Sequence, residues 1–221
     1  SAIVGRLVGE DALAAVGASY ALTNVFICIA VGGGVGASVI VSRHFGAKEY
    51  SRMKLAVSTA FLTFLAVSLL LATFGLAFCR QIMLALHTPP EVLDMAVQYL
   101  GIYFCGLPFL FMYNVISSMF NALGKSRIPL CFLVFSSLFN IGLDLVLVQR
   151  FRLGVAGVAW ATLIAQGLSA LLSFGVFLYV LKKLECGKTG IFDKKELADM
   201  TRIALPSILQ QSIISIGMML V

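Results

Sequence analysis

The chain has 221 residues, of which 60% are hydrophobic and only 12% are charged, whereas soluble domains carry about 25% charged residues. Together with a mean hydropathy of +1.01, this composition excludes an ordinary soluble domain and indicates a membrane protein. The net charge of +6 does not indicate nucleic-acid binding, because the basic residues lie in short loops between apolar runs rather than in one patch.

Six apolar runs with few or no charged residues follow one another along the chain. They cover residues 12–42, 55–79, 95–124, 128–149, 153–181 and 203–221. A helix needs about 20 apolar residues to cross the hydrocarbon core, and runs of this length cannot be the short alternating strands of a membrane barrel. We therefore predict an all-α polytopic membrane helix bundle with five full spans and the start of a sixth.

The basic residues sort to one side of this bundle. If successive runs cross in alternating directions, all but four of the 16 Lys and Arg residues fall in the loops 43–54, 124–128 and 182–202. Basic loops mark the cytoplasmic side of a membrane protein. We therefore predict a multi-pass protein of the cell membrane in which these three loops are cytoplasmic.

The first run ends in a cluster of glycines. The letters GGGVGA at 32–37 fit a dinucleotide fingerprint, but that motif needs a strand before it and a βαβ unit around it. Gly32 and Gly36 instead have the small-xxx-small spacing of closely packed helices, and we interpret them as a packing or kink site. We interpret His44, which follows beside Arg43, as a solvated or lipid-facing residue.

Polar residues are sparse in the third run. Tyr99 lies near its outer end, Pro108 in its middle and Asn114 deeper. Pro108 should kink the helix, because proline removes a backbone hydrogen bond. Asn114 is expected either to form an interhelical hydrogen bond or to line a polar cavity.

The fourth run contains Asp144, the one acidic residue that the sequence places inside an apolar run. An ionisable group at membrane depth is costly and is by default a functional-site hypothesis. Asn140 lies one helical turn earlier, so both side chains leave the helix on the same face. At about 1.5 Å per residue, Asp144 lies ~9 Å from Arg150, which places it in the outer half of the bilayer.

The fifth run begins with small residues and carries Thr162 and Gln166 on one face. A short outer turn joins it to the fourth run, and counting residues brings Thr162 to the depth of Asp144. We therefore expect Thr162 to face Asp144. The polar stretch 182–202 is the longest loop, with an amphipathic helix expected at 193–200, and Pro206, Gln210 and Gln211 then open a new span.

The five cysteines fall singly, without the spacing of a zinc site or a disulfide framework. We therefore expect no cofactor beyond a coupling ion.

Six short motifs occur in order along the chain: ALAAVGAS at 12–19, GAK at 46–48, PF at 108–109, ALGKSRIP at 122–129, N-x-x-x-D at 140–144 and GVAGVAWAT at 154–162. Together they resemble the multidrug and toxic compound extrusion (MATE) family over essentially the whole chain, although no single motif is specific. The resemblance implies two six-helix lobes around a central cleft, with helices two to six and the start of helix seven in this chain.

This resemblance also implies a division of the chain. Residues 1–184 would form the N-terminal lobe without its first helix, 185–200 would link the lobes, and 201–221 would begin the C-terminal lobe. The partners of the chain would then be helix one and the C-terminal lobe of the same protein, membrane lipid, and small cationic or amphipathic substrates.

The resemblance assigns a cation site as well. The family's first lobe has an Asp on helix one and an Asn and an Asp on helix five, and the last two match Asn140 and Asp144. A helix-six Thr resembles Thr162. We therefore predict Asp144, Asn140 and Thr162 as cation-coupling residues, of which Asp144 and Asn140 could hold Na⁺.

Four further residues are predicted to line the cavity. Tyr99 and Asn114 resemble polar positions of helix four in the family, and Gln166 shares a face with Thr162. Gln210 lies where some members have a helix-seven Glu, which weakens the expectation of an ion site in the second lobe.

These observations predict a proton- or sodium-coupled antiporter that exports cationic or amphipathic molecules by alternating access, and not an enzyme. A lipid-linked oligosaccharide flippase or polysaccharide exporter of the same superfamily is an alternative, but it should carry basic residues in the cavity, and none lie within the apolar runs. An intramembrane enzyme would need a second acid, a His pair or a nucleophile at the depth of Asp144. A purely structural membrane subunit would not need Asp144 at all.

Overall fold

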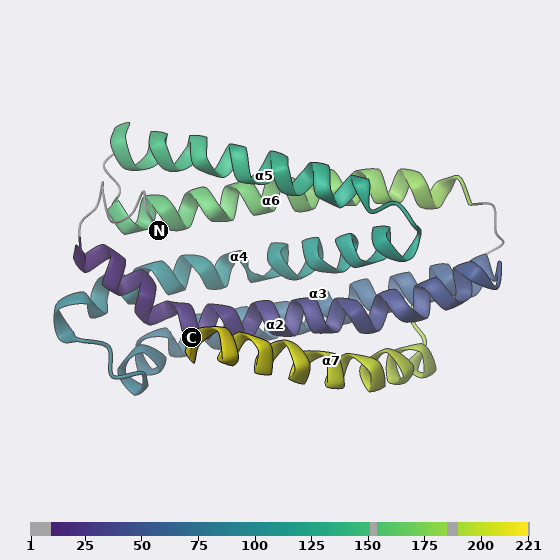
Figure 1. Cartoon of the computed structure of the whole chain (residues 1–221), viewed down its shortest axis with the longest axis horizontal. Coiled ribbons are helices and arrows are strands. Elements are labelled where there is room, and N and C mark those ends of the chain that lie inside the picture. Colours follow the sequence, from purple (N-terminus) through teal and green to yellow (C-terminus); the bar gives the residue numbers. More distant parts are fainter. Residues whose placement is uncertain (1–9, 151–153, 185–189, 221) are drawn as a thin grey trace.

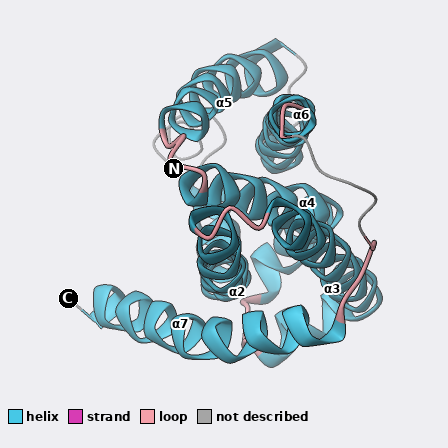
Figure 2. Ribbon diagram, turned by 90° about the vertical axis from the view of Figure 1, so that its right-hand side faces the viewer, coloured by secondary structure: helices cyan, strands magenta, loops and turns pink. Residues whose placement is uncertain are grey.

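The computed structural model describes residues 10–150, 154–184 and 190–220, which form a bundle of long helices without strands. The helices are α2 (Glu10–Gly46), α3 (Tyr50–Ala85), α4 (Pro90–Ala122), α5 (Arg127–Leu145), its π-helical continuation η1 (Val146–Arg150), α6 (Gly154–Lys182) and α7 (Lys194–Leu220). Figure 1 shows α5 and α6 paired on one side, α4 next to them, then α2 and α3, and α7 on the far side. The end-on view in Figure 2 shows the same order, and the predicted all-α fold is confirmed.

Five helices of the described part are long and apolar enough to cross a membrane: Leu22–Gly46, Tyr50–Ala85, Pro90–Ala122, Arg127–Val148 and Gly154–Lys182. They coincide with the first five apolar runs of the sequence. The sixth run lies in α7, which is not one of these five.

Helix α7 differs from the sequence prediction at its start. We expected a separate amphipathic helix at 193–200 and a new span opening at Pro206, but α7 is one helix from Lys194 onward with Pro206 inside it. A proline inside a helix removes one backbone hydrogen bond, and neighbouring side chains can satisfy freed carbonyl groups. The helix continues through Pro206, and one residue later the hydroxyl of Ser207 donates to the carbonyl of Ile203 at 3.1 Å.

Two clusters of buried side chains hold the bundle together. One lies toward the end where α2 meets α3, and it includes Phe120 and Phe177, whose rings pack edge-on with centroids 5.2 Å apart. The other lies toward the opposite end, where Phe26 and Phe104 pack in the same way at 5.5 Å. Helices α2, α3 and α4 contribute to both clusters, and α4 is the central helix because it packs on α2, α3 and α6.

The two glycines singled out in α2 lie against α7. A Cβ atom at Gly36 would lie 2.5 Å from the backbone oxygen of Met200, and one at Gly32 would lie 2.7 Å from backbone atoms of Ile208. Contacts this short exclude any side chain at either position, so the predicted close packing at Gly32 and Gly36 is confirmed.

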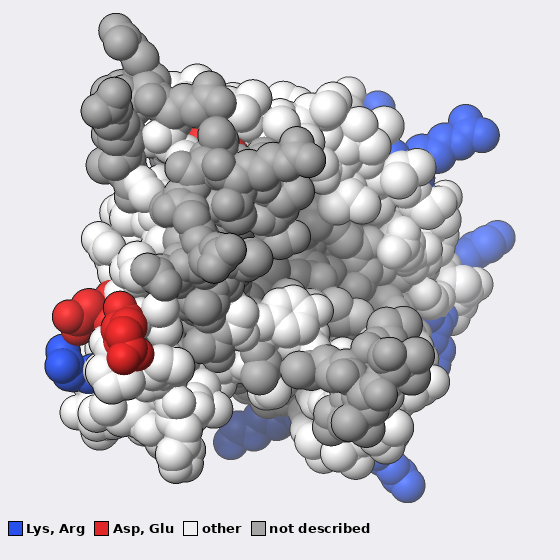
Figure 3. Space-filling view, turned by 60° about the vertical axis from the view of Figure 1, so that its left-hand side comes forward, with Lys and Arg blue, Asp and Glu red and all other residues white. Residues whose placement is uncertain are grey.

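Charge is distributed unequally between the two ends of the bundle. The α2–α3 turn, the α4–α5 turn and the segment that leads into α7 lie at the same end (Figure 1). In Figure 3 the opposite end comes forward and shows the acidic side chains, while most of the visible Lys and Arg side chains project from the far end. The arrangement agrees with the charge asymmetry of the predicted cytoplasmic loops.

Candidate functional site

Asp144 is buried on a helix whose other side chains are mostly exposed. Among the described residues of α5, only Pro129 and Asp144 are buried, and Asp144 keeps 8% of its surface exposed. Leu138, Ile141 and Leu145 around it are 66%, 48% and 40% exposed, as expected for side chains that face lipid. The carboxylate therefore points into the protein from a helix that is otherwise turned toward the membrane.

Asn140 and Thr162 join α5 to α6 beside this carboxylate. The amide Nδ2 of Asn140 donates to Oγ1 of Thr162 at 3.4 Å, and the Thr162 hydroxyl donates to the carbonyl of Val158 at 3.0 Å. Since Asn140 lies one turn from Asp144 on the same face, the structure brings together the three residues that we predicted to couple a cation.

One oxygen of the Asp144 carboxylate has no hydrogen-bond partner. Within the described part of the chain, Oδ1 of Asp144 and the hydroxyl of Ser169 are the buried side-chain oxygen atoms without one. Buried polar groups are nearly always hydrogen-bonded, so an orphaned oxygen calls for an explanation such as a bound ion or proton. The Asp144 carboxylate is thus chemically incomplete in the protein alone.

Tyr99, Thr162 and Gln166 border a small cavity between α4 and α6. Its volume is about 10 Å³, which is close to the least space that holds one water molecule. Tyr99 also lies within electrostatic range of Asp144. Two of the four predicted cavity-lining residues, Tyr99 and Gln166, therefore line one small cavity together with Thr162.

The other two predicted cavity residues lie elsewhere. The amide of Asn114 donates to the carbonyl of Leu110 in its own helix at 2.8 Å, so its bond is not interhelical. Gln210 is exposed on α7, and α7 lies on the opposite side of the bundle from α5 and α6 (Figure 2). The sequence could not reveal this separation, because helix order along the chain does not fix helix positions across a bundle.

The helix geometry changes directly after Asp144. Residues Val146–Arg150 form the π-helical turn η1, which continues α5. Such turns are rare and occur often at functional sites, because the extra residue per turn re-aims the neighbouring side chains.

The donor atoms around Asp144 suit a proton or a hard monovalent cation. Asp144, Asn140 and Thr162 offer carboxylate, amide and hydroxyl oxygens, the ligand type that hard cations prefer. Among the described residues no three His, Cys, Asp or Glu side chains gather as they do in transition-metal sites. The orphaned Oδ1 of Asp144 supplies the one negative charge of this set.

The interpretation of His44 as solvated or lipid-facing is wrong. His44 is only 3% exposed and lies between the carboxylates of Glu49 and Glu196. Glu196 lies far away along the chain on α7, so the sequence held only a weak signal, namely the acidic residue five positions after His44.

Comparisons with known proteins agree with this architecture. A family model described as MatE matches residues 1–146. The chain is 30% identical over 226 residues to the probable multidrug resistance protein YoeA of Bacillus subtilis (strain 168), with 97% of this chain and 48% of that protein covered. It is 29% identical over 180 residues to the multidrug export protein MepA of Staphylococcus aureus (strain MRSA252), with 80% and 39% covered.

Solved structures give the same result for the fold. A crystal structure of MATE in the bent conformation superposes with a TM-score of 0.88 at 25% identity, over 99% of this chain and 49% of that chain. The chain spans less than half of the length of YoeA, of MepA and of this solved relative.

Proposed function

The chain belongs to the MatE family of membrane transporters, and from this premise we propose that it carries the cation-coupling site of an exporter of cationic or amphipathic small molecules. The family consists of transporters, so the prediction that the chain is not an enzyme is confirmed. Since the chain spans less than half of its curated relatives, the activity proposed belongs to the whole protein that contains it.

The observation that carries the proposal is the carboxylate of Asp144, which is buried and whose Oδ1 atom has no hydrogen-bond partner among the described residues. A buried charge without a partner is expensive in a membrane. A bound proton would remove the charge of the carboxylate, and a bound Na⁺ would compensate it. The free energy of the site therefore changes with the ion, which is the requirement for coupling an ion gradient to a conformational change.

The ion also alters the contact between two helices. Asn140 and Thr162 hold α5 against α6 through their side chains, and an ion shared with Asp144 would recruit the same oxygens. We propose that occupation of the site changes how α5 packs on α6, and that this repacking drives alternating access to a cleft between two lobes. The division into lobes at 185–200 is part of this proposal.

The substrate class rests on the relatives. YoeA is described as a probable multidrug resistance protein and MepA as a multidrug export protein. We propose the same role for the protein that contains this chain, with the basic loops 43–54, 124–128 and 182–202 in the cytoplasm and the bundle in the cell membrane.

The test is ion-driven dye efflux in everted membrane vesicles that contain the full-length protein. A proton gradient and a Na⁺ gradient are applied separately, and loss of fluorescence of a cationic dye is followed. Asp144→Asn should reduce efflux to the rate of vesicles without the transporter under either gradient. The ion whose gradient drives dye efflux by the wild-type protein is the coupling ion.

The control is Asp94→Asn, the same substitution at the start of α4 on a side chain that is 88% exposed. It should leave efflux unchanged. Normal expression of both variants, checked by size-exclusion chromatography, separates loss of function from loss of fold. If Asp144→Asn kept wild-type efflux and ion dependence, the proposed role of Asp144 would be refuted.

A further inference from the structure

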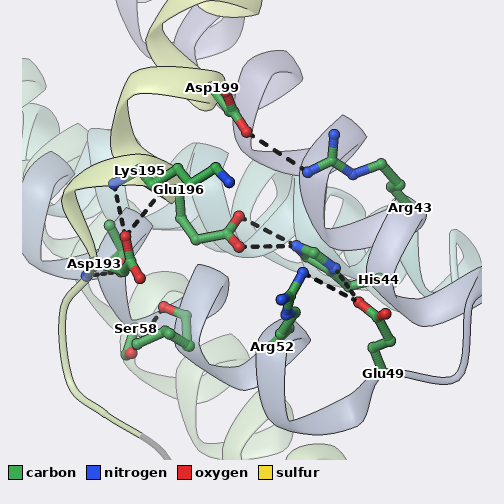
Figure 4. A network of polar contacts seen from close by, with 11 residues as sticks. Arg43, His44, Glu49, Arg52, Ser58, Asp193, Lys195, Glu196 and Asp199 are labelled. Carbon is green, nitrogen blue, oxygen red and sulfur yellow. Dashed lines mark hydrogen bonds and ion pairs between the residues drawn. The ribbon is translucent and has the colours of Figure 1, made fainter.

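A buried histidine joins α2, α3 and α7 at the end of the bundle with the basic loops. His44 lies in the last turn of α2, and its side chain is 4% exposed. Its Nδ1 lies 3.1 Å from Oε2 of Glu49, which directly precedes α3. Its Nε2 lies 3.1 Å from Oε1 and 3.2 Å from Oε2 of Glu196 on α7. Figure 4 shows the imidazole ring between the two carboxylates.

This geometry requires a proton on each ring nitrogen. An ionised carboxylate only accepts hydrogen bonds, and a neutral imidazole donates from one nitrogen while the other presents a lone pair. In the neutral form, one of the two contacts would therefore bring a lone pair to a carboxylate oxygen at 3.1 Å. When both carboxylates are ionised, the imidazolium form of His44 is the form that donates to both Glu49 and Glu196.

The charges around the ring balance only when His44 is cationic. Arg43 pairs with Asp199 of α7 at 3.7 Å, and Arg52 of α3 lies 3.9 Å from Glu49. With the imidazolium, three positive groups (Arg43, His44 and Arg52) face three negative groups (Glu49, Glu196 and Asp199). Loss of the proton leaves one carboxylate of this cluster uncompensated.

The positions of His44 and Glu196 at helix ends favour a cation at His44 and an anion at Glu196. His44 belongs to the last turn of α2 and Glu196 to the first turn of α7. A cation is stabilised at the C-terminal end of a helix and an anion at the N-terminal end. Asp193 caps α7 through the backbone N–H of Lys195 at 2.6 Å, so the first turn that presents Glu196 is fixed in place.

The rest of the contact between α2 and α7 is formed by uncharged groups. Along the membrane α7 lies against Gly32 and Gly36 of α2, and Sγ of Cys28 lies 3.3 Å from Oγ of Ser215. An apolar cavity of about 210 Å³ also separates part of α7 from α3 and α4, bordered by Phe64, Phe111 and Leu205 among others. Among the described residues, the charged contacts between α2 and α7 are those of Arg43 and His44 at this end of the helix.

We propose that His44 is a protonatable latch: as an imidazolium it fastens the first turn of α7 to the α2–α3 turn, and its deprotonation releases that end of α7. The latch should weaken as the pH rises, because a rise in pH removes the proton from the imidazolium. On the proposed division of the chain, Glu196 lies in the linker 185–200 and α7 continues into the second lobe, so the latch would join the first lobe to the cytoplasmic linker that leads into the second. The latch does not depend on the ion bound at Asp144.

The test is backbone hydrogen exchange, followed by mass spectrometry, in the full-length protein in lipid nanodiscs. Exchange protection of residues 197–204 is compared at about pH 6 and about pH 9, after correction for the intrinsic exchange rate. Wild-type protection should fall at least about tenfold between these values, equivalent to ~1.4 kcal/mol. His44→Gln keeps a polar side chain without the charge, and it should be poorly protected already at pH 6.

Two further variants test whether the charge at position 44 is responsible for the pH response. His44→Lys should stay protected at both pH values, because its cation is retained through this range. His87→Asn removes the chain's other histidine, exposed at the opposite end, and should keep the wild-type pH response. Residues 100–116 of α4 report global unfolding and should be unaffected in every variant.

Two results would overturn the latch. One is equal protection of residues 197–204 in the wild type at both pH values, a measurement that needs no variant. The other is wild-type protection of these residues at pH 6 in His44→Gln. Since neither measurement involves transport, failure of the latch and failure of the proposed ion coupling at Asp144 are distinguishable.

Discussion

Removing the charge of Asp144 should stabilise the protein while it abolishes transport. The side chain is 8% exposed, and in the part of the chain that the structure describes its Oδ1 has no hydrogen-bond partner. A charged residue at the centre of a membrane helix costs about 2.5–3.5 kcal/mol on insertion scales. Asp144 lies toward the end of α5 and beside two polar side chains, so we expect Asp144→Asn to recover only about 1–2 kcal/mol.

The assay is thermal unfolding of the purified protein in nanodiscs without substrate. For a chain of this size, 1 kcal/mol shifts the unfolding midpoint by about 2–4 °C, so Asp144→Asn should raise the midpoint by about 2–8 °C. Asp94→Asn is exposed and should stay within about 0.5 kcal/mol of the wild type. A lower midpoint in Asp144→Asn would refute the reasoning, because it would mean that the carboxylate makes a structural contact which an amide cannot replace.

Three other substitutions test the packing described above by the same unfolding assay. Thr162→Val removes the acceptor for Asn140 and should cost about 1–2 kcal/mol, with a change in the ion concentration for half-maximal efflux. Gly36→Ala places a methyl group against the backbone of α7 and should cost about 1–3 kcal/mol. Phe104→Ala empties a fully buried site and should cost about 3–5 kcal/mol.

Each of these substitutions has a matched control in the chain. Thr73→Val removes an exposed hydroxyl that bonds only its own helix, and should be nearly neutral. Gly175→Ala adds a methyl group with no atom within 4 Å, and should stabilise by about 0.5–1 kcal/mol. Phe74 is 60% exposed, so Phe74→Ala should cost far less than Phe104→Ala. Equal effects within a pair would contradict the packing on which that prediction depends.

The membrane spans could be predicted because their signal is local. Each of the first five runs is apolar over a length that only a membrane-spanning helix requires, and each matches a helix of the structure. The helix around Pro206 was harder to predict from the sequence. The polar residues 193–202 and the apolar residues after them differ in composition, but backbone hydrogen bonding continues across that change and makes them one helix.

The contact between Asn140 and Thr162 could also be anticipated. A short turn joins their helices, and residue counting places both side chains at one depth. Asn114 and Gln210 show the limit of this reasoning. Depth alone does not say which neighbour a side chain faces, and Gln210 lies on a helix that packs on α2, away from α5 and α6.

His44 could not be understood from its own surroundings in the sequence. Beside Arg43 and close to a loop, it has the pattern of an interfacial residue. Its burial depends on Glu196, which approaches only because Gly32 and Gly36 let α7 lie against α2. The structural role of this histidine thus depends on glycines in another part of its helix.

The length of α5 has a consequence for how the lipid environment reaches Asp144. Arg127–Val148 is the shortest of the five candidate spans, with 22 residues, or ~33 Å of helix against a hydrocarbon core of about 30 Å. Longer helices such as α3 can absorb a change in bilayer thickness by tilting, but α5 has almost no spare length. A thicker membrane would therefore strain the helix that carries Asp144 before it strains the rest of the bundle.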